Sequence, residues 1–401
     1  MIRKVYGRYF LMALTSLPIK TVKTLLINLM ILCLFISDAL LSIDKGLSFL
    51  IKLAALCLLL ASFCIHRHNK NMAILLVLFL IYLTISLNLT FSYQAGIEEA
   101  FRYIASIPLM YAFFHLKGIS KSTFKLIVWI IWTNNIYYIY VLASLKLGLP
   151  TLGELRFDHG LLLRSEGWVD NFSLLAFSNM CLAIYYSQFS SLKSKLALVF
   201  SLFSISMKLI PTYLVFIFVF FSTRLKVIIL FSTLALASYV YASEFFQNVM
   251  YLFDSRIEAY LTNVESVRAQ SYVVMFKSLV DRPLLGYGVG SFGGPSSVIY
   301  NSPIYQLYNF NWGWLEGTIT TTDTFYPHLF VELGLVGSVL FFSLFFKTVL
   351  KNRNLKVPAL IILITFLIDN LLSFSLVSLT YLTIFLVFIR KLSENKASNE
   401  I

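Results

Sequence analysis

Residues 281–292 read Asp-Arg-Pro-Leu-Leu-Gly-Tyr-Gly-Val-Gly-Ser-Phe, and they lie within the only long polar segment of an otherwise apolar chain. This segment runs from about Tyr241 to Tyr326. At roughly 80 residues it is too long for a simple connector, because most connections between helices are a few residues long and longer ones tend to be functional. We expect it to be an extracytoplasmic loop that carries the chemistry, with the apolar segments on either side as its scaffold.

The composition is that of a membrane protein. Hydrophobic residues make up 59% of the 401 positions and charged residues only 13%. Repeated apolar runs approach or exceed the roughly 18 to 20 residues that a helix needs to cross a bilayer. A transmembrane β-barrel would alternate apolar and polar residues, and runs such as residues 73–81 do not alternate. The composition therefore predicts an all-α polytopic membrane protein.

The apolar runs predict about 12 transmembrane helices by length and hydrophobicity. They lie near Thr24–Ser42, Leu47–Ile65, Met72–Thr90, Ala100–Phe114, Phe124–Leu145, Phe172–Ser187, Leu196–Met207, Thr212–Phe221, Val227–Ala242, Phe325–Phe346, Val357–Ile368 and Leu372–Phe388. The predicted domains are an N-terminal transmembrane bundle over residues 1–243, a large periplasmic loop with short helices over residues 244–324, and C-terminal transmembrane helices with a cytoplasmic tail over residues 325–401.

The net charge of +13 follows the predicted topology. If the N-terminus is cytoplasmic, most Lys and Arg residues fall in the loops on the inner side, which is the positive-inside pattern. Both termini are therefore expected in the cytoplasm, in a bacterial inner (cytoplasmic) membrane, and the charge does not indicate nucleic-acid binding. The N-terminus lacks the pattern of a cleaved signal peptide, so the first span is expected to be a retained anchor.

The sequence carries no motif for a nucleotide or a metal ion. It has no P-loop, dinucleotide fingerprint or His-Glu-x-x-His motif. The four cysteines, Cys33, Cys57, Cys64 and Cys181, all fall inside predicted spans, where a thiol behaves as a small hydrophobe. We expect no metal and no cofactor, so that any energy for a reaction would come with the substrate.

Basic residues on the predicted outer side need a separate reason, because the positive-inside pattern leaves few of them there. Arg164, Lys208 and Arg268 come to this surface, where they could bind the phosphates of a lipid-linked donor. Alternatively, they pair with local carboxylates such as Glu166 or Asp170. Within a predicted span, Arg102 lies three residues after Glu99, and that spacing favours an internal ion pair.

The polar segment and its flanks resemble the O-antigen ligase and polymerase superfamily. The resemblance rests on Arg268, on the run of residues 282–292, on Asp-Thr-Phe-Tyr at residues 323–326, and on Glu-Leu-Gly-Leu-Val-Gly at residues 332–337. Residues 164–171 are similar to that family's Arg…Gly…Asn segment, and residues 204–208 stand where the family has a Ser- or Thr-rich run ending in Arg. The likeness covers about residues 155–390.

The sequence departs from the pattern of this superfamily at two positions, and the second departure favours one branch. Lys208 stands in place of the expected Arg, which keeps the charge but loses the bidentate fork. Asp323 stands where the ligases carry a His-Asn pair, and the pattern around it is similar to the Wzy-type polymerase branch. His328 is therefore expected to be a packed or interfacial histidine rather than the family's catalytic one.

The resemblance implies a polymerase that takes a glycan from an undecaprenyl-pyrophosphate carrier and transfers it to another carrier-linked repeat unit. Arg268 and Arg164 would bind the pyrophosphate with help from Lys208, and Asp323 would act as general base or position the acceptor. Glu166 and Asp170 remain alternative bases, and Asp323 could instead be a helix N-cap. Further candidates for binding pyrophosphate or glycan are Arg282, Asn171, Tyr326, Trp312 and Trp314, although the two Trp residues could also be interfacial anchors.

Two other functions compete with the polymerase. A ligase would move finished glycan to the lipid A core, and the Asp at position 323 argues against it. A lipid-linked oligosaccharide flippase would share the hydrophobicity and topology, but it would not need the long outer loop. The expected partners of a polymerase are the lipid-linked donor and acceptor, the bilayer and a chain-length regulator protein.

Overall fold

The computed structural model describes residues 19–41, 43–64, 69–116, 118–151, 157–158, 162–163, 166–169, 171–204, 206–224, 226, 266–312, 321–351 and 355–394. Most of these residues are helical, as the composition predicts. The strands among them are a pair of two-residue antiparallel strands, β1 (Phe157–Asp158) and β2 (Leu162–Leu163). The predicted span at residues 227–242 lies outside the described residues.

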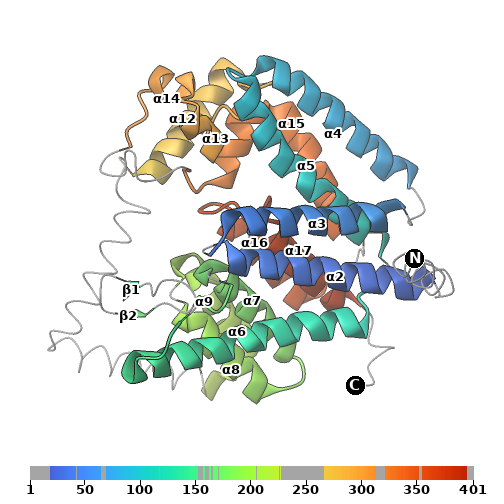
Figure 1. The fold of residues 1–401 in the computed structure, drawn as a ribbon, viewed down its shortest axis with the longest axis vertical. Coiled ribbons are helices and arrows are strands. Elements are labelled where there is room, and N and C mark those ends of the chain that lie inside the picture. The colour runs from blue at the N-terminus through green and yellow to red at the C-terminus, as the bar shows by residue number, and fades with distance from the viewer. Residues whose placement is uncertain are drawn as a thin grey trace, which may run out of the picture.

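Five long helices make up the first part of the chain. They are α2 (Ile19–Leu40), α3 (Lys45–Cys64), α4 (Lys70–Leu89), α5 (Tyr93–His115) and α6 (Lys121–Leu147). Side-chain oxygens of Asn69, Ser92 and Ser120 accept hydrogen bonds from the first turns of α4, α5 and α6, so polar residues between the apolar runs set where these helices begin. Figure 1 shows α2 and α3 side by side across the middle of the molecule, with α4 and α5 above them.

Shorter helices follow on the other side of α2 and α3. They are α7 (Phe172–Tyr186), α8 (Ser191–Phe203), the 3-10 turn η1 (Met207–Leu209) and α9 (Ile210–Phe220). The predicted span near Leu196–Met207 is thus helix α8, which begins and ends earlier. The C-terminal part contains α15 (Phe325–Val349), α16 (Val357–Asp369) and α17 (Leu379–Ser393). Stacked rings of Phe345, Phe366 and Phe385 join these three helices in the core.

The predicted loop is folded onto the helical scaffold. Its described part contains α12 (Val267–Asp281), α13 (Pro295–Ile299) and α14 (Pro303–Leu307). Helix α12 packs against α15, and α13 packs against α5. Figure 1 shows these three helices gathered at the upper left, beside α15 and the end of α5.

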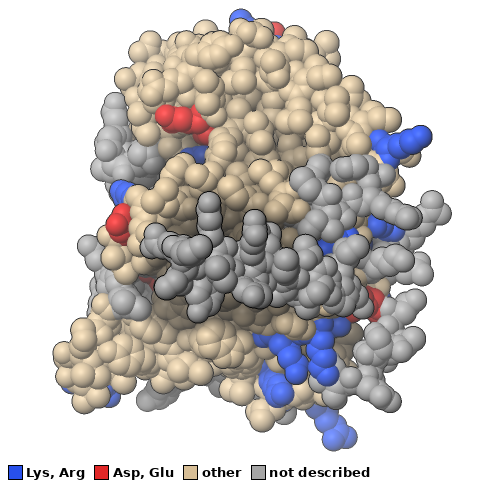
Figure 2. Space-filling model, turned by 45° about the vertical axis from the view of Figure 1, so that its right-hand side comes forward, with Lys and Arg blue, Asp and Glu red and all other residues tan. Residues whose placement is uncertain are grey.

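Four helices in the described part of the chain are long and apolar enough to cross a membrane. They cover residues 21–40, 70–89, 121–147 and 325–349. Many large apolar side chains on such helices are exposed, for example Ile74 at 56% and Trp129 at 62%, which suits contact with lipid. Most of the described surface in the view of Figure 2 is neither Lys, Arg, Asp nor Glu, and a group of Lys and Arg side chains lies at the lower right. The fold is compatible with a helical membrane protein, while about 12 spans and a periplasmic loop stay predictions.

Candidate functional site

Helix α15 is broken at Gly334, and the glycine-rich run docks into the break. Gly334 has φ 57° and ψ −165°, a backbone conformation that essentially only glycine adopts. The residues around this point hydrogen-bond to the run instead of to their own helix. Tyr287 and Gly288 donate their N–H groups to the carbonyls of Val331 and Glu332, at 2.9 and 3.0 Å. In return, the N–H groups of residues 335 and 336 reach the carbonyls of residues 283 and 284, at 2.8 and 3.2 Å.

Close backbone contact explains why glycines occupy both sides of this junction. A Cβ on Gly286 would lie 2.6 Å from the carbonyl oxygen of Glu332, and a Cβ on Gly334 would lie 2.6 Å from that of Leu284. Tyr82 of α4 covers the junction, because its hydroxyl lies within hydrogen-bond distance of the carbonyls of Leu285 and Leu333. The glycine run is therefore a structural turn that completes a broken helix.

A buried polar cluster lies next to the break and joins α5 to α15. The Nε2 atom of His328 lies 2.9 Å from Glu332 Oε2 and 3.4 Å from Glu99 Oε1, and all three side chains are at most 2% exposed. Tyr103 donates its hydroxyl to Glu332 Oε2 at 3.2 Å, and the N–H of Phe292 donates to Glu332 Oε1 at 3.2 Å. Glu332 thus ties the glycine run to both helices.

This cluster was only partly predicted from the sequence. The Glu99–Arg102 ion pair is present at 3.4 Å, as the spacing predicts. His328 is packed against the rings of Tyr103 and Phe374, also as predicted. The role of Glu332 was missed. The signal was its position four residues after His328 within an apolar run, since ionisable residues inside membrane helices usually pair with one another.

Arg268 and Asp323 meet at the start of α15. The Arg268 Nη2 atom donates to Asp323 Oδ2 at 3.0 Å, and these side chains are 22% and 51% exposed. Ser266 caps α12 and so places Arg268 in its first turn. The turn before α15 is held by the N–H of Thr322, which donates to the carbonyl of Gly293 at 3.0 Å. A cation and a carboxylate from distant parts of the sequence therefore lie together at an accessible place.

Asp323 is not the helix cap that the sequence left open as an alternative. The N-cap position of α15 is Thr324, and its side chain makes no capping hydrogen bond. Asp323 has φ 53°, an uncommon value for a residue with a side chain. Its carboxylate turns to Arg268 rather than to the N–H groups of the first helical turn. This leaves the carboxylate half-exposed beside a guanidinium group.

The other predicted site residues are spread over the molecule. Tyr326 donates its hydroxyl to the carbonyl of Leu367 at 2.8 Å. Trp312 packs its ring against Tyr305 and Phe310, at centroid distances of 4.9 and 4.8 Å. Lys208 is in η1, which packs beside α16. Arg282 ends α12, about 20 Å from Arg268 at 1.5 Å per helical residue, so it does not join the Arg268–Asp323 pair.

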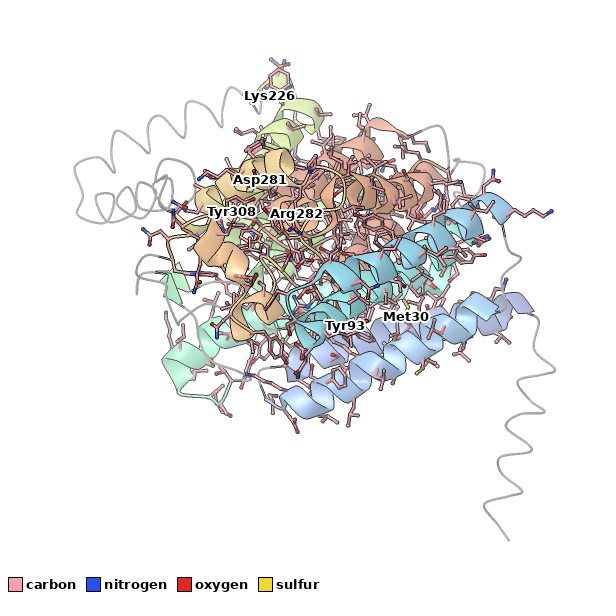
Figure 3. All side chains as sticks on the ribbon, turned by 90° about the horizontal axis from the view of Figure 1, so that it is seen from above. Met30, Tyr93, Lys226, Asp281, Arg282 and Tyr308 are labelled. Carbon is pink, nitrogen blue, oxygen red and sulfur yellow. The ribbon has the colours of Figure 1, made fainter. Side chains whose placement is uncertain are left out.

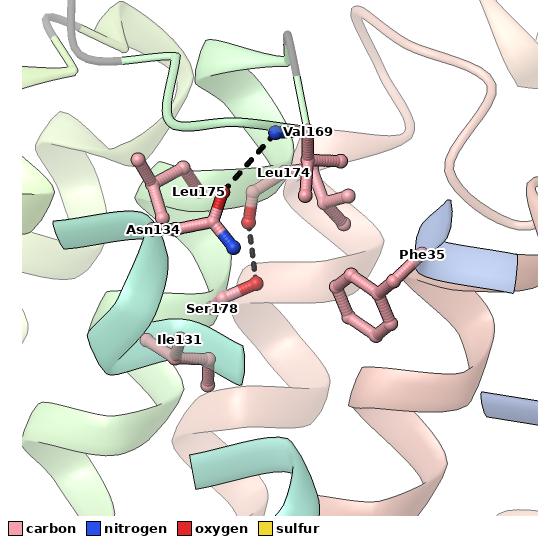
Figure 4. Close-up of a pocket in the computed structure, with 7 residues that line it drawn as sticks. All are labelled: Phe35, Ile131, Asn134, Val169, Leu174, Leu175 and Ser178. Carbon is pink, nitrogen blue, oxygen red and sulfur yellow. Dashed lines mark hydrogen bonds between the residues drawn. The ribbon is translucent and has the colours of Figure 1, made fainter. Parts of the chain in front are cut away.

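The segment at residues 166–171 is described in part. Asn171 caps α7 by accepting a hydrogen bond from the N–H of Leu174 at 2.9 Å, and Glu166 is 7% exposed. Arg164, Asp170 and Trp314 lie outside the described residues. The pocket beside this segment, drawn in Figure 4, has a volume of about 10 Å³ and lies between Asn134, Val169 and Ser178. It has room for about one water molecule and not for a sugar.

Among the described residues, no group of three or more His, Cys, Asp and Glu side chains is arranged to hold a metal ion. Comparisons with protein-family models, with curated proteins and with solved structures found no match to this chain. The fold and the site define an α-helical protein compatible with a membrane, with a broken helix, a buried polar cluster and an accessible Arg–Asp pair.

Proposed function

We propose that this protein is a glycosyltransferase that polymerises undecaprenyl-pyrophosphate-linked repeat units into a surface polysaccharide. The observation that carries the proposal is the Arg268–Asp323 pair, 3.0 Å apart and partly exposed at the start of α15. Transfer of a glycan from a pyrophosphate carrier needs a cation for the leaving group and a base for the acceptor hydroxyl. These two residue types lie together here, and the resemblance in sequence assigns them the same roles.

The reaction can be written through these two side chains. Asp323 accepts the proton of the acceptor hydroxyl, whose oxygen then bonds to the anomeric carbon of the donor glycan. The bond from that carbon to the pyrophosphate oxygen breaks, and the electron pair stays on the pyrophosphate. Arg268 leaves its contact with Asp323 and binds the departing anion through its planar fork. The donor supplies its own leaving group, so the transfer needs no nucleotide.

The remaining assignments are part of the same proposal. Arg164 and Lys208 assist in binding the pyrophosphate, and Glu166 or Asp170 is the alternative base. The site faces the periplasm of a bacterial inner membrane, both termini are cytoplasmic, and a chain-length regulator is a further partner. His328 is 2% exposed between two aromatic rings, which supports the polymerase branch over a ligase that would use this histidine.

Reconstitution tests the proposal directly. The purified protein in nanodiscs receives only undecaprenyl-pyrophosphate-linked repeat units, and gel electrophoresis and mass spectrometry follow the products. We expect the wild type to produce a ladder of carrier-linked chains. Asp323→Asn should slow it by roughly 10²- to 10⁴-fold, the usual contribution of a general base. Arg268→Ala should slow it by roughly 10²- to 10³-fold, because a fixed charge at the leaving oxygen is lost.

The control is Lys277→Ala, which removes an exposed cation from the same helix α12 and should leave the ladder unchanged. Transfer that occurs only when a lipid A core acceptor is added would identify a ligase. Movement of the carrier across the bilayer without any new glycosidic bond would identify a flippase. Either result would overturn the proposed polymerase.

A further inference from the structure

A pocket of about 580 Å³ opens at the end of α12 opposite to Arg268. The residues that line it include Leu89, Phe91, Arg282, Tyr287, Ser291 and Leu307. Its volume lies within the range of roughly 300 to 1,000 Å³ that is usual for small-molecule sites. The lining is mainly apolar with a few polar groups, which is also usual for such sites. The Arg268–Asp323 pair takes no part in it.

Arg282 supplies a positioned cation at this pocket. Its guanidinium carbon lies 4.6 Å from the centre of the Tyr287 ring. The Tyr287 and Tyr308 hydroxyls lie 2.6 Å apart, and Tyr308 donates to Asp281 Oδ2 at 2.6 Å. Burial and the hydrogen bond to Asp281 raise the pKa of Tyr308. The Tyr308 hydroxyl therefore stays protonated and can donate to Asp281. Figure 3 shows Asp281, Arg282 and Tyr308 grouped together.

The fork of Arg282 is available to a ligand. Asp281 is the neighbouring carboxylate, and it accepts the hydroxyl of Tyr308. Among the described residues, no acidic side chain forms an ion pair with Arg282, and its guanidinium group lies over the Tyr287 ring. A guanidinium group that lies over a ring keeps its N–H groups directed outward, where they can bind two oxygens of a carboxylate or phosphate.

Ser291 is a second polar group that points to a ligand. Its side chain is 1% exposed and lines the pocket, and its Oγ atom has no hydrogen-bond partner among the described residues. A buried hydroxyl without a partner costs free energy, similar to a lost hydrogen bond. A bound acceptor oxygen would remove that cost.

The position of the pocket at the end of α4 indicates what kind of anion can reach it. Leu89 is the last residue of α4, one of the helices long and apolar enough to cross a membrane. The pocket therefore opens where that span ends, and Leu307 on its wall is 59% exposed. A ligand with an apolar stem can enter from the bilayer at this level while its head meets Arg282.

We infer that this pocket binds the phosphate head of a lipid, with the phosphate on Arg282 and Ser291 and the stem along Leu89, Phe91 and Leu307. The lipid is either a polyprenyl phosphate or an ordinary anionic phospholipid, since both present the same chemistry. The inference does not depend on polymerase activity, because the pocket and the Arg268–Asp323 pair lie at opposite ends of α12.

Native mass spectrometry of the detergent-solubilised protein tests this site by titration with undecaprenyl phosphate. Undecaprenol, which lacks the phosphate, is the matched uncharged probe. Arg282→Gln should weaken binding of the phosphate roughly ten-fold or more, because a charge-assisted contact is lost. Arg282→Lys should fall between that variant and the wild type, since it keeps the charge without the fork. Lys277→Gln removes a cation from the same helix outside the pocket and should bind as the wild type does.

A second variant helps to distinguish a specific loss of binding from a folding defect in the Arg282 variants. Leu307→Asp places a negative charge on the exposed wall without touching Arg282, and it should weaken binding to a similar extent. Equal retention of undecaprenol and undecaprenyl phosphate would overturn the inference, and so would equal losses in Arg282→Gln and Lys277→Gln. If inorganic phosphate alone saturated the site, the role assigned to the apolar stem of the lipid would be overturned.

A parallel titration with phosphatidylglycerol separates the two sources. If it displaces undecaprenyl phosphate and shows the same loss in Arg282→Gln, the occupant is a bulk phospholipid. If undecaprenyl phosphate persists against excess phosphatidylglycerol, the occupant is the carrier lipid. Both results support a lipid-phosphate site.

Discussion

Single hydroxyl and carboxylate groups hold the junction between the glycine run and α15. The Tyr82 hydroxyl lies within hydrogen-bond distance of backbone carbonyls on both sides of this junction, at 3.1 Å for Leu285. Tyr82→Phe should lower the free energy of unfolding by about 1 to 3 kcal/mol, because a buried acceptor loses its donor. Tyr93→Phe is the control, since Tyr93 is 63% exposed. Equal denaturant midpoints for the two variants would contradict this role.

Glu332 is expected to contribute more to the stability of the fold than any exposed carboxylate. Glu332→Ala leaves His328, the Tyr103 hydroxyl and the N–H of Phe292 without their shared acceptor. Each buried donor left without its acceptor costs about 1 to 3 kcal/mol. We expect Glu332→Ala to lose most of its folded yield, and Glu332→Gln, which keeps an acceptor oxygen, to retain more.

Glu98→Ala provides the comparison for the buried carboxylate. Glu98 is the neighbour of Glu99 and accepts hydrogen bonds from Ser296 and Tyr300 near the surface. Its loss should cost less than about 1 kcal/mol, as is usual at a surface. Size-exclusion chromatography and denaturant unfolding measure both effects. A Glu98 variant as unstable as Glu332→Ala would show that burial is not the cause.

At the scale of elements, the break in α15 is the feature that positions the site. Gly334→Ala combines a forbidden backbone conformation with a Cβ 2.6 Å from the carbonyl of Leu284. Gly148→Ala is a matched control, because Gly148 also has a positive φ of 64° but a Cβ added there would meet nothing within 4 Å. Gly148→Ala should cost about 1 to 2 kcal/mol from its backbone alone. Gly334→Ala should cost clearly more, and thermal unfolding of both variants measures the difference.

The elements were largely predictable, and their interruptions were not. The apolar runs located α2 to α6 and α15 to α17, because lipid-facing and buried positions both require apolar residues. The sequence predicts residues 325–346 as one span, since Gly334 gives no sign that a distant run repairs the backbone there. The last span begins at Leu379 instead of Leu372, because Asp369 accepts hydrogen bonds from Ser373 and Ser375 in a turn.

The sequence predicted which residues belong to the candidate site, but not which of them contact one another. Arg268 and Asp323 were both proposed from the resemblance, and the structure brings them into contact. The contact between Glu99, His328 and Glu332 joins residues that lie far apart in the sequence, so local spacing could reveal only its two halves. Arg164, Asp170 and Trp314 stay predictions.

At the scale of the whole molecule, the positive-inside pattern predicts the orientation of α6, a 27-residue candidate span. Its first residue, Lys121, should face the cytoplasm, and Lys146 near its end should face the periplasm. Lys146→Cys should react with a membrane-impermeant maleimide in spheroplasts, whereas Lys121→Cys should react only after permeabilisation. The reverse order of labelling would invert the topology and place the Arg268–Asp323 pair on the cytoplasmic side.

The shared backbone of α15 and the glycine run also limits how the protein can move. Separating them would leave the hydrogen bonds of Tyr287, Gly288, Leu335 and Val336 unmade beside the fully buried Glu332 and Leu333. The two segments should therefore open and close as one rigid unit, with their amides among the last to exchange with deuterium. In the proposed polymerase, a gate for a long glycan would then work by tilting this unit against its neighbours, with the hinge outside the glycines.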